Sequence, residues 1–327
     1  MEVFYLKAVL MTRWRFFGCV SIILMMLWCV PFGVIGQTPT IIRIGFSSMV
    51  MGDVNENDAM AALKIWAQSF ARERGIVAES YPRIFRNVTE IDGALTDKAV
   101  DCICLSTMEY VELGTKLAGD TVVVGSTSGS IMESYVLLVH SDSGIQSLEN
   151  LRGHAIGMVH NARTCLAPVW LDTLLAREAL GSAADFFEKI LPGSKTAKAV
   201  LPVFFRQVDA CLVTRNGFEI MRELNPQMGQ YLKVLAQSPP LVPVVFCFRS
   251  DYASPVRKQI MAELSRWHLN PAGRQILMLF QSDSLEKYPV SCLDTTLELL
   301  AEHRRLFREI PIAPAGMSTD YSLKGTP

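Results

Sequence analysis

The chain has 327 residues and a formal net charge of −1, and 50% of its residues are hydrophobic. Because it has no excess of basic side chains to neutralise phosphate groups, the composition argues against a nucleic-acid partner. The length is ample for a buried core and suggests two domains.

Residues 1–36 have the order of a secretory signal. Arg13 and Arg15 precede an apolar run over residues 16–35, and Val34-Ile35-Gly36 supplies the small or branched residues that a signal peptidase recognises. Cleavage after Gly36 would leave an exported, periplasmic protein. The alternative is an uncleaved membrane anchor, because about 20 apolar residues can also span a bilayer.

Strand and helix patterns then alternate along the chain. Four short apolar segments have the character of strands: residues 41–46, 78–85, 101–105 and 121–124. Three segments have helical spacing of their apolar residues: 59–74, 87–98 and 108–117. Strands that alternate with helices over short loops predict a parallel sheet with helices on both faces.

A second α/β unit follows the same pattern. Its predicted strands are residues 135–140, 154–159, 208–214 and 232–235. A helix with Pro168 in its first turn lies between the second and the third of these strands. Residues 244–248 are apolar enough to return to the first sheet, and helices are predicted over residues 255–269 and 271–280.

The chain crosses twice between the units, near residues 126–135 and 236–244, which predicts two Rossmann-like α/β lobes joined by a double-crossing hinge. The predicted division is residues 37–131 with 241–312 for the first lobe, 132–240 for the second, and 313–327 as a disordered tail. In open α/β sheets a ligand sits at the carboxyl ends of the strands, where helix N-termini point their N–H groups at it.

Three stretches resemble one known family. They are Tyr135-Val136-Leu137-Leu138-Val139-His140-Ser141-Asp142-Ser143-Gly144-Ile145 with Leu151-Arg152-Gly153, Ser194-Lys195 through Gln207-Val208-Asp209-Ala210, and Ala272-Gly273-Arg274-Gln275. They resemble the phosphate/phosphonate-type substrate-binding proteins of ABC transporters, which have the type II periplasmic-binding fold, and the resemblance runs from Ile41 to about Phe280. It implies a protein, expected to be a monomer, that captures a phosphate, a phosphonate or a related oxyanion or carboxylate for an ABC permease.

The loop that holds the anion in this family departs from the family pattern. In place of a Ser-Thr-Ser-Gly loop the chain has His160-Asn161-Ala162-Arg163-Thr164-Cys165, so Thr164 supplies the one comparable hydroxyl and Arg163 adds a charge. A cation at a helix N-terminus opposes the macrodipole, and an anion between them would offset that, although a solvated loop arginine is the alternative. Ser126-Thr127-Ser128-Gly129 lies too early in the chain and is interpreted as hinge or loop.

Further ligand contacts are predicted in both lobes. Ser47, Ser48, Ser106 and Thr107 follow strands of the first lobe and either face the ligand or only cap helices. Tyr110 resembles an aromatic residue that lines the family's cleft, and a core position is the alternative. Asp209 opens an apolar strand, where a carboxylate needs a partner, and it resembles the family's ligand-facing aspartate. Lys195 replaces a family histidine and is interpreted as solvated.

The sequence contains no nucleophile elbow, no Walker loop and no metal-ligand spacing, so we expect no enzyme activity, cofactor or metal. Six cysteines follow the signal: Cys102, Cys104, Cys165, Cys211, Cys247 and Cys292. Export permits disulfides, but the sequence does not choose a pairing, and buried thiols are the simpler interpretation. The alternatives to transport are a sensing module for a separate membrane kinase or chemoreceptor, and an enzyme on the same fold.

Overall fold

The computed structural model describes residues 40–51, 55–73 and 78–307. The predicted signal over residues 1–36 and the predicted tail over residues 313–327 lie outside the described residues. Among the described residues, no helix combines the length and the apolar character needed to cross a bilayer.

Six strands form the first sheet, in the order β11-β4-β10-β3-β1-β2. Their bounds are β1 Thr40–Ser47, β2 Ala78–Phe85, β3 Cys102–Ser106, β4 Thr121–Ser126, β10 Val244–Phe248 and β11 Ser284–Pro289. Strand β1 pairs in parallel with β2 and β3, whereas β10 runs antiparallel to β3 and β4, and β11 runs antiparallel to β4. The predicted parallel sheet is therefore a mixed sheet, and the return of residues 244–248 to it is confirmed.

Five strands form the second sheet, in the order β7-β6-β8-β5-β9. Their bounds are β5 Tyr135–His140, β6 Ala155–Val159, β7 Lys189–Gly193, β8 Ala210–Thr214 and β9 Leu232–Gln237. Strand β6 pairs in parallel with β7 and β8, and β5 runs antiparallel to β8 and β9. The sequence did not predict β7, because Lys189 and Pro192 interrupt its apolar pattern at the sheet edge.

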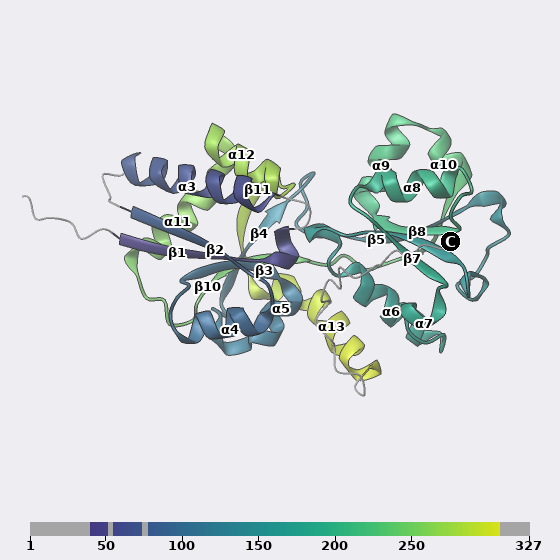
Figure 1. The fold of residues 1–327 in the computed structure, drawn as a ribbon, viewed down its shortest axis with the longest axis horizontal. Helices are drawn as coiled ribbons and strands as arrows, with labels where there is room; N and C mark the ends of the chain where they lie inside the picture. Colours follow the sequence, from purple (N-terminus) through teal and green to yellow (C-terminus); the bar gives the residue numbers. More distant parts are fainter. Residues whose placement is uncertain (1–39, 52–54, 74–77, 308–327) are drawn as a thin grey trace, which may run out of the picture. The chain divides into compact units, whose positions relative to one another are not determined.

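Helices cover both faces of each sheet (Figure 1). Beside the first sheet lie α2 Ser48–Met51, α3 Glu56–Glu73, α4 Val88–Thr96, α5 Thr107–Leu113, α11 Pro255–Leu264 and α12 Pro271–Leu279. Beside the second sheet lie α6 Ala167–Arg177, α7 Ala183–Phe186, α8 Thr196–Phe204, α9 Arg215–Leu224 and α10 Gln227–Tyr231. The apolar side chains of α3, α11 and α12 pack on one face of the first sheet, and those of α4 and α5 pack on the other.

The two crossings between the sheets are paired with each other. Glu133 N–H donates to Leu241 O at 2.7 Å and Leu241 N–H donates to Glu133 O at 2.8 Å, while Tyr135 N–H donates to Ser238 Oγ at 2.7 Å. These bonds lie between β4 and β5 on one crossing and between β9 and β10 on the other, where the sequence predicted the chain to cross. The fold is two Rossmann-like α/β lobes with a double crossing, which is the type II periplasmic-binding architecture.

The last described helix, α13 Asp294–Leu306, was not predicted from the sequence. Its Leu299 and Leu300 belong to the same buried cluster as Trp170 of α6, and Glu302 accepts a hydrogen bond from Arg177 Nε at 2.9 Å. Leu297 packs instead against the cluster of the first sheet. Although residues 241–312 were assigned to the first lobe, α13 therefore contacts helices of both.

The six described cysteines are free thiols. Burial raises the pKa of Cys104 to about 12, and it raises the pKa of Cys211 further still. Such thiols are protonated and unreactive at neutral pH. No group of three or more potential metal ligands occurs within the described part of the chain.

Candidate ligand-binding site

Polar side chains at the carboxyl ends of β1 and β3 bond to one another. Ser47 Oγ donates to Glu109 Oε1 at 2.5 Å, and Ser106 Oγ donates to Glu109 Oε2 at 2.9 Å. Glu109 also accepts from Ser106 N–H at 2.9 Å, which completes a capping box at the start of α5. All three residues are buried, so the hydroxyls of Ser47 and Ser106 satisfy a buried carboxylate.

The other predicted contacts of the first lobe also have protein partners. Ser48 Oγ donates to Arg86 O at 3.2 Å, Thr107 Oγ1 donates to Val242 O at 2.5 Å, and Tyr110 OH donates to Ala118 O at 3.1 Å. Thr107 and Tyr110 are buried, and Tyr110 packs in the cluster under α4 and α5. None of these three, nor Ser47 or Ser106, is among the residues that line the spaces described next.

The loop after β6 holds Arg163 in a defined position. Asn161 Oδ1 accepts from Arg163 N–H at 3.0 Å and from Thr164 N–H at 3.1 Å, and the Thr164 hydroxyl donates to Val159 O at 2.7 Å. Tyr135, which is fully buried, donates its phenolic O–H to Arg163 O at 2.9 Å. The Thr164 side chain is therefore used to shape the loop, while the guanidinium of Arg163 extends beyond it.

The guanidinium of Arg163 forms an ion pair with Glu133, which lies on the first crossing. The Glu133 side chain is 8% exposed and that of Arg163 is 19% exposed. Burial raises the pKa of the Glu133 carboxyl above its ordinary value, although the Arg163 charge acts in the opposite direction. The pair is thus partly desolvated, and Arg163 is the more accessible partner.

On one side of Arg163 lies a polar recess of about 100 Å³. It is lined by Val159, Asn161, Arg163, Thr164, Thr196, Thr214, Asn216, Gly217, Ile220 and Gln281. Among these described lining residues none is acidic. We name this space the polar recess.

Two helices begin at the polar recess. Helix α8 starts at Thr196 without a side-chain cap, so its first N–H groups have no side-chain acceptor. Helix α9 starts after Thr214, whose hydroxyl accepts from Gly217 N–H at 3.2 Å. The Thr196 hydroxyl and Asn161 Nδ2 have no hydrogen-bond partner within the described part of the chain, so these donors are available to a ligand.

Glycine at position 217 lets the two helix starts approach each other. A Cβ atom there would lie 2.8 Å from Thr196 Oγ1 and 2.9 Å from Thr214 Oγ1. Both distances are shorter than van der Waals contact, so the two hydroxyls converge on one point only because residue 217 lacks a side chain.

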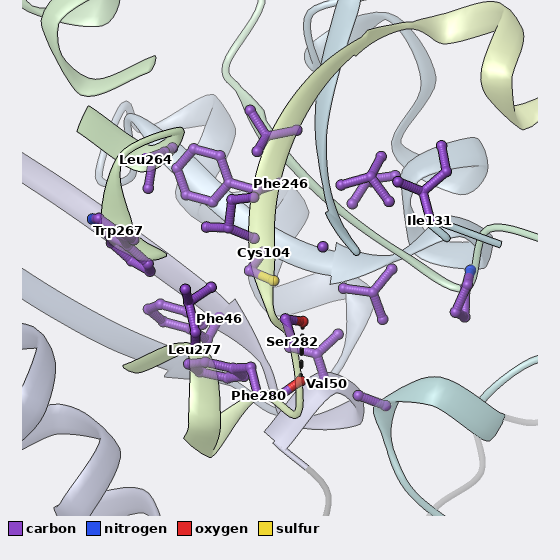
Figure 2. A pocket seen from close by; sticks show the side chains of 18 of the residues that line it. Phe46, Val50, Cys104, Ile131, Phe246, Leu264, Trp267, Leu277, Phe280 and Ser282 are labelled. Atoms are coloured by element: carbon purple, nitrogen blue, oxygen red, sulfur yellow. Dashed lines mark hydrogen bonds between the residues drawn. The ribbon is translucent and has the colours of Figure 1, made fainter. Parts of the chain in front are cut away.

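On the other side of Arg163 lies an apolar cavity of about 110 Å³ between the first sheet and helices α11 and α12. Figure 2 shows its lining, where Cys104 and Phe246 project from neighbouring strands and Phe46, Leu277 and Phe280 surround them. Glu133 and Arg163 are also among its lining residues. We name this space the apolar cavity.

Asp209 does not lie with Arg163. It precedes β8, and its carboxylate accepts from Ala155 N–H at 3.1 Å and lies 3.2 Å from His154 Nδ1. Because β6 and β8 are parallel, this is the amino end of both strands, whereas the Arg163 loop follows the carboxyl end of β6. Asp209 thus has a structural partner at the opposite ends of these strands from the Arg163 loop.

Lys195 is exposed, as predicted.

Several residues of the site were not predicted. Glu109 could have been found from the spacing Ser106-x-x-Glu109, which is a capping-box signature. Thr196 follows β7, which was missed. Thr214 ends β8, as predicted, but neither it nor Asn216 was predicted to be a contact. No local sequence pattern pointed to Glu133, because its pairing with Arg163 depends on how the first crossing lies in the folded chain.

The family model for the "ABC transporter, phosphonate, periplasmic substrate-binding protein" matches residues 51–288. No curated protein sequence matches the chain. Solved structures show the same fold at low identity. XAC2383 from Xanthomonas citri, bound to chloride ion, is 17% identical with a TM-score of 0.59, and the match covers 83% of this chain and 99% of that one.

Two further structures are similar. A binding protein component of an ABC phosphonate transporter from Pseudomonas aeruginosa is 17% identical with a TM-score of 0.53, covering 82% of this chain and 88% of that one. PhnD1 from Prochlorococcus marinus, in complex with methylphosphonate, is 15% identical with a TM-score of 0.51, covering 84% and 100%. The chain belongs to the phosphonate-type periplasmic substrate-binding proteins of ABC transporters, which confirms the resemblance found in the sequence.

Proposed function

We propose that this protein captures a small organic or inorganic anion outside the cytoplasmic membrane and delivers it to an ABC permease. The observation that carries the proposal is the position of Arg163, which lines a polar recess where α8 and α9 begin. Membership of the family supports the role in transport, and the signal pattern of residues 1–36 supports export.

The chemistry of the polar recess favours an anion. Helix N-termini carry partial positive charge and N–H donors, and Arg163 adds a full charge with several N–H groups in a planar fork. The hydroxyls of Thr196 and Thr214 and the amide of Asn161 add neutral donors. The relatives bound to chloride and to methylphosphonate are consistent with this class of ligand.

The proposed role is binding without catalysis. Burial raises the pKa of the Cys165 thiol, which follows the Arg163 loop in the sequence, so this thiol stays protonated at neutral pH. A sensing role remains the alternative, in which the same binding event reports to a separate membrane kinase or chemoreceptor. Uptake of the identified ligand in cells that lack this chain separates the two roles, because loss of uptake supports transport and unchanged uptake supports sensing.

A thermal-unfolding screen against phosphate, phosphonates, sulfonates and carboxylates tests the anion proposal. A ligand present at about 100 times its Kd adds about 2.7 kcal/mol to the free energy of unfolding, which is readily measured. Arg206, which forms an exposed pair with Asp142 at 2.6 Å, provides a control position. Stabilisation that Arg163→Ala removes and Arg206→Ala retains supports the proposal. If no anion stabilises the protein, the proposed function is wrong.

A further inference from the structure

The two faces of the first sheet are packed differently. On one face, Ile103 and Leu105 of β3 are fully buried, and Val245 and Cys247 of β10 are each 1% exposed. On the opposite face, Cys104 and Phe246 are partly exposed, although they lie in the same two strands and pair directly across them. Both strands are interior to the sheet, so this exposure does not come from a sheet edge.

The exposure of Cys104 and Phe246 comes from the apolar cavity, which both residues line. Figure 2 shows Cys104, Phe246 and Phe280 turned toward the same space, with Trp267 and Leu264 beyond them. Phe280 is also partly exposed. Solvent therefore reaches the centre of an apolar layer, which a well-packed core would fill.

The apolar cavity adjoins the proposed anion site at Arg163, which lines both. Arg163 lines the cavity, the polar recess and a third space that includes Asn161 and Phe280. A ligand whose charged group contacts Arg163 would thus meet an apolar opening on one side of it. Glu133, which is paired with Arg163, is the one acidic residue among the described residues that line the cavity.

We infer that the ligand is an organic anion with a compact apolar group, held with its charged end at Arg163 and its apolar group in the cavity beside Cys104 and Phe246. This inference rests on the proposed function, because Arg163 supplies the anion contact. It adds an apolar group to the proposed anion, and a site for inorganic phosphate would not need to accommodate such a group.

The volume sets the size of the apolar group. An apolar cavity of roughly 150 Å³ lined by aliphatic and aromatic side chains accommodates benzene. The cavity here is about 110 Å³ and has a similar lining, so we expect an apolar group of about four to six carbon atoms. Longer chains would have to displace side chains of α11 or α12.

Two ligand series test this inference by calorimetry. One consists of methyl-, butyl- and phenylphosphonate, and the other of acetate, pentanoate and benzoate. Each methylene group that leaves water raises affinity by about fourfold, so butylphosphonate should bind at least about tenfold more tightly than methylphosphonate. The same trend is expected from acetate to pentanoate. These measurements use the unaltered protein and do not depend on whether any variant folds.

A matched pair of variants locates the apolar group. Cys104→Leu fills the cavity and should reduce the gain from methyl to butyl to less than about threefold, while binding of the methyl compound is retained. Cys104→Ala keeps the space open and should keep the gain. Full retention of the gain in Cys104→Leu would place the apolar group elsewhere and overturn the inference.

The outcomes separate this inference from the proposed function. If the affinity stays constant or falls as the apolar group lengthens, anion binding is intact and the inference alone is overturned. A rise in the melting temperature of Cys104→Leu would then identify the cavity as a packing void. Failure of every member of both series to bind overturns the inference, and the proposed function falls with it only if phosphate and the sulfonates of the thermal-unfolding screen also fail to bind.

Discussion

The polar recess and the apolar cavity lie on two sides of the same arginine and have opposite chemistry. Apart from Gln281, the residues that line the recess belong to the second lobe, whereas most of the residues that line the cavity belong to strands and helices of the first. The difference shows that the carboxyl ends of strands do not become binding sites merely by carrying hydroxyl groups. In the first lobe Glu109 accepts hydrogen bonds from the hydroxyls of Ser47 and Ser106. In the second lobe the Thr196 hydroxyl can still donate a hydrogen bond to a ligand.

The position of Arg163 joins these two regions. Asn161 and Tyr135 bond to its backbone and so fix its loop, and its guanidinium reaches from this loop to the first crossing. Glu133 neutralises it from the first crossing. An incoming anion must therefore share the guanidinium with a carboxylate, and this competition makes Arg163 and Glu133 the most informative positions for mutation.

The largest effect on anion binding is expected from Arg163→Ala. Charged hydrogen bonds contribute roughly 1.5–3 kcal/mol each, so affinity should fall by about 10- to 150-fold in calorimetry. The free energy of unfolding should also fall, because Glu133 would stay buried without its counter-ion. The double variant Arg163→Ala with Glu133→Gln separates the two effects. Wild-type affinity in that double variant would show that the anion binds elsewhere.

A smaller effect, of the opposite sign, is expected from Glu133→Gln. At an effective dielectric constant of about 20, a charge about 10 Å from an anion changes its energy by about 1.7 kcal/mol, and solvent screening reduces this. Removal of the carboxylate should thus strengthen anion binding by about 3- to 10-fold while the melting temperature falls. A loss of affinity would instead mean that the Glu133 carboxylate contacts the ligand directly, through a cationic group of the ligand.

Thr214→Val should weaken anion binding by about 2- to 5-fold, because it removes one neutral hydroxyl from the polar recess. It also removes the cap of α9, which costs about 1 kcal/mol of stability. Ser182 caps α7, away from the recess, so Ser182→Ala provides the matched control for loss of a cap. Equal affinities in the two variants would exclude Thr214 from the site.

Much of the fold could be predicted from the sequence because its strands are short apolar runs separated by turns. Residues 78–85, 135–140 and 244–248 were predicted with their observed bounds. Strands β7 and β11 were missed because they lie at sheet edges, where polar residues such as Lys189 and Glu286 are tolerated and the alternation is lost. The directions of β10 and β11 depend on tertiary pairing and have no local signal.

The site was less predictable than the fold. The role of Arg163 was predicted from its position in the loop after β6, where related proteins bind their anion, and it stays a prediction. The role of Asp209 was predicted from its place at the start of an apolar strand and from resemblance, and the structure gives it a partner at the amino ends of the strands. Hydrogen-bond partners such as Glu109 for Ser47 are 62 positions apart in the sequence, so no local pattern could reveal that these hydroxyls have acceptors.

The smallest effect on anion binding is expected from Ser106→Ala. The variant removes a hydroxyl that donates to Glu109 and caps α5, so the free energy of unfolding should fall by about 0.5–2 kcal/mol. Affinity for the anion should stay within about twofold of wild type, because Ser106 is fully buried and does not line either space. Chemical denaturation and calorimetry on the same protein sample measure the two quantities. A tenfold loss of affinity without loss of stability would instead show that this hydroxyl faces the ligand, and the contrast between the strand ends of the two lobes would then have to be abandoned.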